Sequence, residues 1–252
     1  MDEIKIIGIV GAGQMGRGIA QVGIASGFNV ILNDISDELL TSSRKFIESK
    51  FLKLVEKGKL TKENVEKYLS LLHTSNNINE LSIADFVIEA VSEKKVLKFE
   101  LFKTLDNLVK PSGLFVSNTS SISITELAAQ TKRPDKVAGM HFMNPVPVMA
   151  LVEGIRGLET SDDTFQAVKN VAKKMGKSFV AVKDIPGFAV NRILMPMINE
   201  AIYTLYEGIA SIEDIDTSMT LGTNVPMGPL TLADFIGLDT CLASMEVLNE
   251  GL

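Results

Sequence analysis

Residues 4–17 read IKIIGIVGAGQMGR, and this stretch decides the fold. An apolar run typical of a buried strand leads directly into Gly11, Gly13 and Gly16, which have the spacing G-x-G-x-x-G. In such a strand–turn–helix unit, the first glycine allows a tight turn. The second lets a dinucleotide pyrophosphate approach the backbone, and the third lets the helix and strand pack closely. The free N–H groups at the start of the helix then favour phosphate.

An acidic residue at the end of the next apolar run supports a dinucleotide site. Asp34 closes the run NVILND, 18 residues after Gly16, where a carboxylate can bind ribose hydroxyls. The alternative is a glycine-rich turn in which Asp34 only caps a helix. Ile35 and Ser36 follow, with no arginine for a 2′-phosphate, so the sequence favours NAD over NADP.

Short apolar runs alternate with longer segments of helical period up to about residue 183. The runs are IKIIGIV, NVILND, ADFVIEAV, GLFVSN, KVAGMHF, VMALVE and SFVAV. This alternation predicts an α/β fold with a parallel, doubly wound sheet, that is, a Rossmann-type N-terminal domain. Two helical patterns separated by Gly58 predict a helical hairpin, about residues 36–72, inserted into that domain.

The pattern changes at DIPGF, residues 184–188, after which only helical patterns follow. We therefore expect an NAD-binding domain of residues 1–186 and an all-α C-terminal domain of residues 187–252. The second domain, with 66 residues, is small for an independent core. We expect it to pack on the first domain or on another subunit.

Composition limits the class of protein. The chain of 252 residues has 25 basic and 31 acidic side chains, a net charge of −6, which argues against a nucleic-acid partner. The acidic start MDEIKIIGIV does not resemble a signal peptide, and no 18-residue apolar run exists to span a membrane. One cysteine and two histidines give no pattern for a disulfide or a metal site. We expect a cytoplasmic protein.

A histidine and a glutamate end neighbouring apolar runs. His141 lies in KVAGMHF and Glu153 closes VMALVE, so adjacent strands would bring them together. A carboxylate on one imidazole nitrogen fixes the tautomer and leaves the other nitrogen to exchange a proton. Hydride transfer between an alcohol and NAD requires such a base. The alternative is a core histidine bonded to the backbone.

Two further polar positions complete the candidate site. Asn118 and Ser120 follow the run GLFVSN, and an S-x-x-E helix cap starting at Ser123 leaves the Ser120 hydroxyl available for a substrate oxygen. Asn191, in PGFAVNR, is either a second such group or a cap or buried bridge in its helix. His73, without an obvious carboxylate partner, is interpreted as structural.

Five stretches together resemble the L-3-hydroxyacyl-CoA dehydrogenase family, most closely its short bacterial members. They are GAGQMGRGIA, SNTSSISITELA, GMHFMNPVPVMALVE, PGFAVNRILMPMINEAI and PMGPLTLADFIGLD, and the similarity extends over essentially the whole chain. The resemblance implies an NAD-dependent dehydrogenase that interconverts an L-3-hydroxyacyl-CoA and its 3-ketoacyl-CoA, with a short acyl chain such as acetoacetyl.

The resemblance also implies roles for the candidate residues. His141 is the catalytic base and Glu153 its partner, while Ser120 and Asn191 contact the C3 oxygen of the substrate.

Implied coenzyme contacts fall on Asp34, Glu93, Lys98 and Asn118. Pattern alone would place Glu93 and Lys98, in EAVSEKKVLKFE, at a solvated helix start.

Lys53 and Lys57, in the expected hairpin, match family contacts to the CoA. A solvated face is the usual role of lysines with this spacing, but the CoA phosphates give both a reason to be basic.

Family members usually continue for a few tens of residues beyond LADFIGLDTCLASMEVLNEG. The missing segment belongs to the helical domain, which forms the dimer contact in the family, so we expect a homodimer if that segment is not essential. Two rival functions remain open. One is a related β-hydroxyacid or sugar-acid dehydrogenase that needs no CoA. The other is a nucleotide-binding regulatory or structural protein that is inactive because of the shortened end.

Overall fold

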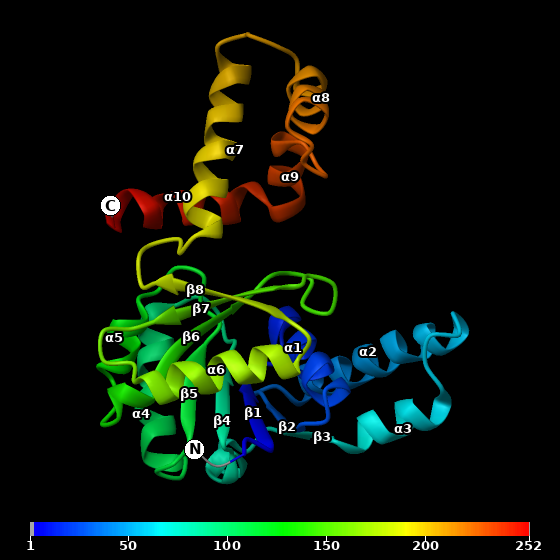
Figure 1. Cartoon of the computed structure of the whole chain (residues 1–252), viewed down its shortest axis with the longest axis vertical. Helices are drawn as coiled ribbons and strands as arrows, with labels where there is room; N and C mark the ends of the chain where they lie inside the picture. The colour runs from blue at the N-terminus through cyan, green and yellow to red at the C-terminus, as the bar shows by residue number, and fades with distance from the viewer. Residues whose placement is uncertain (1–2, 252) are drawn as a thin grey trace. The chain divides into compact units, whose positions relative to one another are not determined.

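The computed structural model describes residues 3–251 (Figure 1). It divides the chain into two compact units, the first ending at Asp184 and the second beginning at Ile185.

Within the described residues, the first unit contains an eight-stranded sheet with the order β3-β2-β1-β4-β5-β6-β7-β8. The strands are β1 (Ile6–Val10), β2 (Asn29–Asn33), β3 (Leu72–Ser75), β4 (Phe86–Glu89), β5 (Leu114–Ser117), β6 (Val137–Phe142), β7 (Leu151–Arg156) and β8 (Ser178–Lys183). Neighbouring strands are parallel except β6 and β7, which are antiparallel. The predicted doubly wound α/β class is confirmed, and the sheet is parallel as expected except at this one pair.

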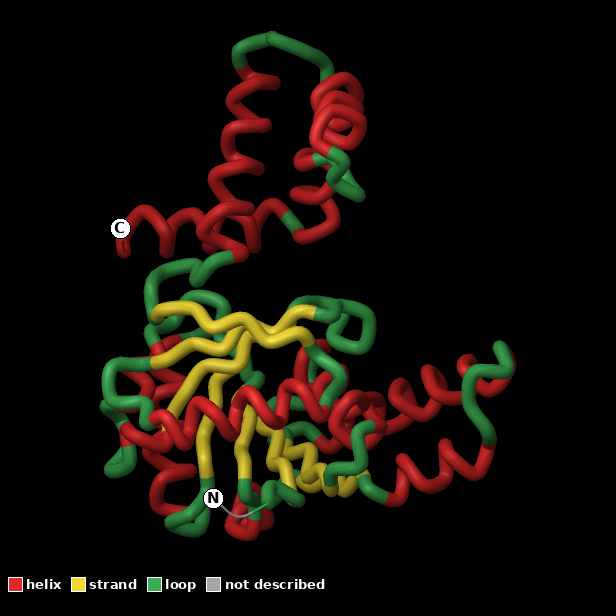
Figure 2. The backbone as a smooth tube through the Cα atoms, viewed as in Figure 1, coloured by secondary structure: helices red, strands yellow, loops and turns green. Residues whose placement is uncertain are grey.

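Helices flank the sheet, and Figure 2 shows α6 crossing one of its faces. The helices of this unit are α1 (Gln14–Ala25), α2 (Asp37–Glu56), α3 (Lys62–Ser70), α4 (Lys95–Leu108), α5 (Ile124–Ala128) and α6 (Asp162–Lys174), with short 3₁₀ turns η1 (Ile78–Ile83) and η2 (Pro134–Lys136). Because helices cover the sheet, the central strands are buried along their whole length, which explains their continuous apolar runs.

The inserted helical hairpin is present as α2 and α3, which extend away from the sheet in Figure 1. Ser36 caps α2 by accepting a hydrogen bond from the backbone N–H of Leu39. The two helices pack through the rings of Phe51 and Tyr68, whose centroids are 5.4 Å apart.

Two strands differ from the sequence prediction. β3 was not expected, because LHTS is a short segment with only one large apolar residue. β7 begins at Leu151, three residues after the start of the run VMALVE, because Val148 to Ala150 belong to the loop between β6 and β7.

The second unit is helical throughout the part of the chain that the structure describes, as predicted. Its helices are α7 (Val190–Tyr206), α8 (Ile212–Thr223), α9 (Pro229–Ile236) and α10 (Leu238–Gly251). Asp216 in α8 accepts hydrogen bonds from the backbone N–H groups of Leu230 and Thr231, both at 2.9 Å, and so caps the start of α9.

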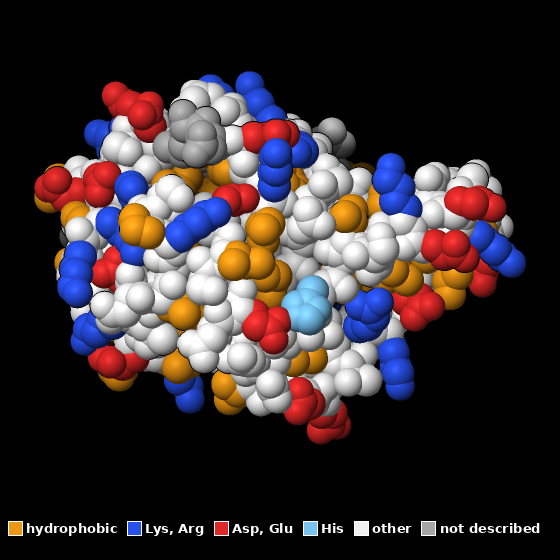
Figure 3. Space-filling model, turned by 90° about the horizontal axis from the view of Figure 1, so that it is seen from below, with side chains coloured by type: hydrophobic (Ala, Val, Ile, Leu, Met, Phe, Trp, Pro, Cys, Tyr) orange, Lys and Arg blue, Asp and Glu red, His pale blue; other side chains and the backbone are white. Residues whose placement is uncertain are grey.

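Surface charge agrees with the acidic composition. On the face shown in Figure 3, acidic and basic side chains are interspersed, and the basic ones form no continuous patch there. Among residues 3–251, no helix is long and apolar enough to cross a membrane.

Candidate active site

The glycine turn after β1 is built so that only glycine fits at two positions. Gly11 has φ +103°, and a Cβ there would lie 2.5 Å from the backbone oxygen of Ala90. A Cβ on Gly16 would lie 1.7 Å from the backbone oxygen of Gly11. The turn therefore packs directly against the first turn of α1, as the motif predicts.

Gly13 differs from its neighbours because a Cβ there would meet none of the described atoms within 4 Å. It is the N-cap of α1, with an extended backbone (φ −67°, ψ −168°) and no side-chain cap for the first N–H groups of the helix. A turn with this open side and these donors fits the pyrophosphate of a dinucleotide.

Gly13→Ala should therefore weaken coenzyme binding without harming the fold. We expect the dissociation constant of NADH, measured by fluorescence titration, to rise at least about tenfold because the methyl group occupies the phosphate side of the turn. The free energy of unfolding in urea should change by less than about 1 kcal/mol, because alanine is a poorer N-cap than glycine but also lowers the entropy of the unfolded chain, and the two effects oppose each other. Gly222→Ala is the matched control, since a Cβ there also meets no described atom. Unchanged NADH affinity in Gly13→Ala would contradict the assignment.

Asp34 lies at the end of β2, beside the glycine turn. Its Oδ2 accepts from the backbone N–H of Ala12 at 2.7 Å, and its Oδ1 accepts from that of Ser36 at 3.0 Å. The carboxylate therefore ties the turn to the end of β2, and its remaining lone pairs are available to ribose hydroxyls.

His141 and Glu153 are directly opposite each other on β6 and β7. The Nδ1 of His141 lies 2.8 Å from Oε2 of Glu153, and the two residues are 7% and 1% exposed. The predicted contact between them is confirmed. A carboxylate on Nδ1 makes Nδ1 the protonated nitrogen of the neutral ring, so Nε2 is the nitrogen suited to proton exchange.

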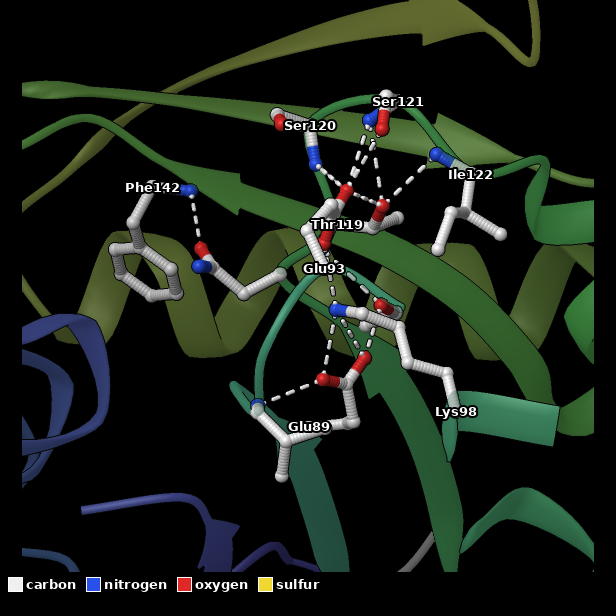
Figure 4. A network of polar contacts seen from close by, with 11 residues as sticks. Glu89, Glu93, Lys98, Thr119, Ser120, Ser121, Ile122 and Phe142 are labelled. Carbon is white, nitrogen blue, oxygen red and sulfur yellow. Dashed lines mark hydrogen bonds and ion pairs between the residues drawn. The ribbon is translucent and has the colours of Figure 1, made fainter. Parts of the chain in front are cut away.

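A buried charge network lies beneath the loop that follows β5 (Figure 4). Lys98, in α4, is 1% exposed, and its Nζ lies 2.8 Å from Oε1 of Glu89 and 2.8 Å from Oε2 of Glu93. Ser117 donates a hydrogen bond to Glu89 at 2.5 Å. The interpretation of Lys98 as a solvated residue at a helix start is therefore wrong.

Glu93 joins this network to Ser120. Its Oε1 accepts hydrogen bonds from the backbone N–H groups of Ser120 (3.0 Å) and Ser121 (3.2 Å), and from the hydroxyls of Ser121 and Thr119. Burial opposes ionisation of Glu93, but the ammonium of Lys98 and the two hydroxyls outweigh it and hold its pKa below the ordinary value. Glu93 is thus an ionised anchor for the backbone at Ser120.

Asn118 bonds to the strand that carries His141. Its Oδ1 accepts from the backbone N–H of Phe142 at 2.9 Å, which places Asn118 and Ser120 at the carboxyl end of β5, beside β6. Ser123 caps α5, as predicted, by accepting from the N–H of Glu126 at 3.3 Å.

Asp184, the last residue of the first unit, reinforces the start of α5. Its carboxylate accepts from the hydroxyl of Ser123 (2.8 Å) and from the backbone N–H groups of Ile124 (2.9 Å) and Thr125 (2.8 Å).

Three predicted residues belong to other elements than those of this cluster. Lys53 is in the last turn of α2, Lys57 follows that helix, and both are exposed. Asn191 belongs to the second unit, in the first turn of α7.

Sequence reasoning missed two contacts. Asn144, in the loop after His141, accepts a hydrogen bond from Nε2 of Gln14 at 3.0 Å, which joins that loop to the start of α1. The expectation that His73 lacks a carboxylate partner is wrong, because its Nε2 lies 2.5 Å from Oε2 of Glu80. Asn144 directly precedes a proline close to a candidate catalytic residue, a signal that would have singled it out.

Comparisons with known proteins cover both units. Residues 6–185 match the family described as 3-hydroxyacyl-CoA dehydrogenase, NAD binding domain, and residues 187–252 match the corresponding C-terminal domain. A probable 3-hydroxybutyryl-CoA dehydrogenase of Bacillus subtilis (strain 168) is 54% identical over 99% of this chain and 87% of that protein. Mitochondrial hydroxyacyl-coenzyme A dehydrogenase of Homo sapiens is 46% identical over 94% of this chain and 77% of that protein.

A solved structure agrees with this assignment. The crystal structure of (S)-3-hydroxybutyryl-CoA dehydrogenase from Ralstonia eutropha has a TM-score of 0.97 and 51% identity to this chain. The match covers 99% of this chain and 88% of that one.

Proposed function

Because this chain belongs to the 3-hydroxyacyl-CoA dehydrogenase family, we propose that it interconverts (S)-3-hydroxybutyryl-CoA and acetoacetyl-CoA with NAD as its coenzyme. The chain is an NAD-dependent oxidoreductase of 3-hydroxyacyl-CoA esters. The choice of the four-carbon substrate rests on the names of its relatives. The observation that carries the chemistry is the buried pair of His141 and Glu153, 2.8 Å apart, in the unit that holds the glycine turn.

His141 is the general acid and base in this proposal. In the oxidative direction, Nε2 accepts the proton of the substrate hydroxyl as the C3–H bond breaks. Glu153 keeps the proton on Nδ1 and stabilises the imidazolium that forms. In the reductive direction, the same imidazolium returns its proton to the oxygen on C3. Ser120 and Asn191 donate hydrogen bonds to that oxygen, and one such donor contributes about 3 kcal/mol in comparable oxyanion sites.

The coenzyme contacts are proposed at the glycine turn, Asp34, Asn118, Glu93 and Lys98. NAD supplies the hydride acceptor when it is bound. The open side of Gly13 and the uncapped start of α1 fit the pyrophosphate, and the carboxylate of Asp34 fits ribose hydroxyls. The ion pair between Glu93 and Lys98 fixes the position of both side chains beside this site.

The decisive experiment mixes the purified chain with NADH and acetoacetyl-CoA and follows the loss of nicotinamide absorbance. Oxidation that requires the CoA ester supports the proposal. Equal oxidation with free acetoacetate would instead identify a β-hydroxyacid dehydrogenase. NADH binding without turnover would count against the proposal.

Replacing both Lys53 and Lys57 with alanine should raise the KM for acetoacetyl-CoA by about tenfold and leave kcat within about twofold. Two exposed ammonium groups that bind CoA phosphates act equally on the ground state and the transition state. The KM for NADH should not change. Lys67→Ala, an exposed lysine of α3 in the same hairpin, is the control. An unchanged KM for acetoacetyl-CoA in the double variant would remove the two lysines from the substrate site.

We also propose that the chain forms a homodimer through its second unit and is located in the cytoplasm. Several large apolar side chains of that unit are exposed, among them Tyr206 (84%), Leu221 (83%) and Phe235 (67%). Large apolar side chains that are left exposed are typical of a subunit contact. Light scattering after size-exclusion chromatography gives the molar mass and so tests the dimer.

A further inference from the structure

Lys177 is a buried lysine in the turn between α6 and β8. It is 9% exposed. Its Nζ donates hydrogen bonds to the backbone oxygen of Val146 and, at 2.8 Å, to that of Met149. Within residues 3–251 it forms no ion pair, so its charge is balanced only by carbonyl dipoles. Burial lowers the pKa of Lys177, which is the expected effect on an ammonium removed from water.

Both carbonyl groups belong to the loop of residues 143–150, which joins β6 to β7. This loop therefore connects the strand that carries His141 with the strand that carries Glu153. Its carbonyl groups at these two positions point to a lysine instead of a neighbouring strand. An ammonium has three donors, so it can satisfy several such acceptors at once.

The same loop rests against the start of α1. Asn144 accepts from the side chain of Gln14, the first residue of α1 and the one after Gly13. Val146 is 2% exposed, and a Cβ on Gly18 would lie 3.0 Å from its Cβ. The loop and the first two turns of α1 are thus in close contact beside the glycine turn.

We propose that Lys177 is a positioning residue for the coenzyme site. Its ammonium donates hydrogen bonds to the carbonyls of Val146 and Met149 and so holds the loop against α1. Without the ammonium, the carbonyls of Val146 and Met149 lose their donor. The loop then populates arrangements in which the hydrogen bond between Gln14 and Asn144 is broken. The apparent affinity for coenzyme then falls in proportion to the fraction of molecules that keep the loop in place. This inference rests on the proposed function, because it takes the glycine turn to be a coenzyme site.

The test measures the dissociation constant of NADH by fluorescence titration, which needs no turnover. Lys177→Met, of similar length but uncharged, should raise it by about tenfold if the closed arrangement falls to a tenth of the population. Lys177→Arg keeps the charge. Its increase in the logarithm of the NADH dissociation constant should be at most half of that in Lys177→Met. Lys173→Met, an exposed lysine in the last turn of α6, should stay within about twofold of the wild type.

A double-mutant cycle separates this role from general stabilisation of the fold. Gln14→Ala removes the contact with Asn144 and should raise the NADH dissociation constant by about threefold to fivefold. Added to Lys177→Met, it should cause almost no further loss, because both changes release the same loop. The inference would be overturned if the fold increases in the NADH dissociation constant from the two single variants multiplied in the double variant. Wild-type NADH affinity in Lys177→Met would also overturn it.

Lys177→Gln covers the case in which the methionine variant does not fold. It is neutral but polar, and wild-type NADH affinity in this variant would likewise overturn the role of the charge. A wild-type chain that fails to bind NADH would count against the proposed function instead, so the two failures are distinguishable.

Discussion

His141→Gln should lower the turnover of acetoacetyl-CoA by about 10²–10⁴-fold, which is the range that general acid–base catalysis contributes. Glutamine keeps a polar side chain at this position, but it cannot take up and release a proton near neutral pH. Glu153 would still occupy the opposite position on β7, 1% exposed, with an amide in place of the imidazole. The dissociation constant of NADH should stay within about twofold, because the glycine turn and Asp34 are untouched.

The second histidine of the chain provides the control. His73 also contacts a carboxylate, that of Glu80, but its side chain is 61% exposed and it lies on β3 at the far edge of the sheet. His73→Gln should therefore leave kcat and both KM values unchanged. Steady-state kinetics at saturating NADH distinguishes the two variants. Turnover in His141→Gln within tenfold of the wild type would exclude His141 as the acid and base.

Lys98→Met should destabilise the first unit by about 3–5 kcal/mol, the usual effect of removing one partner from a buried ion pair. Glu89 is completely buried and Glu93 is held close to the same ammonium, so the variant leaves two carboxylates without the cation that they share. The urea concentration at the midpoint of unfolding, followed by circular dichroism, measures the loss.

A second substitution and a control make this prediction specific. Glu89→Gln, combined with Lys98→Met, should recover part of the lost stability, because it removes one of the two charges while keeping the shape of the side chain. Lys103→Met removes an exposed lysine that pairs with Glu100, and it should cost less than about 0.5 kcal/mol. Equal losses in Lys98→Met and Lys103→Met would show that the buried network contributes no special stability.

The features that sequence predicted are those encoded by local order along the chain. The glycine turn and Asp34 follow from one strand–turn–helix–strand unit, in which each spacing has a steric reason. The contact between His141 and Glu153 followed from the expectation that consecutive runs form neighbouring strands. The change to helices after Asp184 followed from the change in hydrophobic period.

The features that sequence did not predict depend on partners far apart in the chain. An apolar run does not encode strand direction, so the antiparallel pairing of β6 and β7 was not foreseen. Lys98 looks like its exposed neighbours Lys94 and Lys95, and only Glu89 on β4 makes its burial possible. Lys177 follows a glycine in a turn, where lysine is normally solvated, and its partners lie about 30 residues earlier.

The position of Asp184 in the chain determines when the start of α5 receives this cap during synthesis on the ribosome. The Asp184 carboxylate caps α5 from 59 to 61 residues downstream, and it follows β8, which pairs with β7. Domains generally fold as units while synthesis proceeds from the N-terminus. The nascent nucleotide unit therefore has its glycine turn and most of its sheet available early, but the start of α5, beside Ser120, stays without this cap until residue 184 emerges. The hydrogen bonds at the start of α5 are thus completed only by the last residue of this unit.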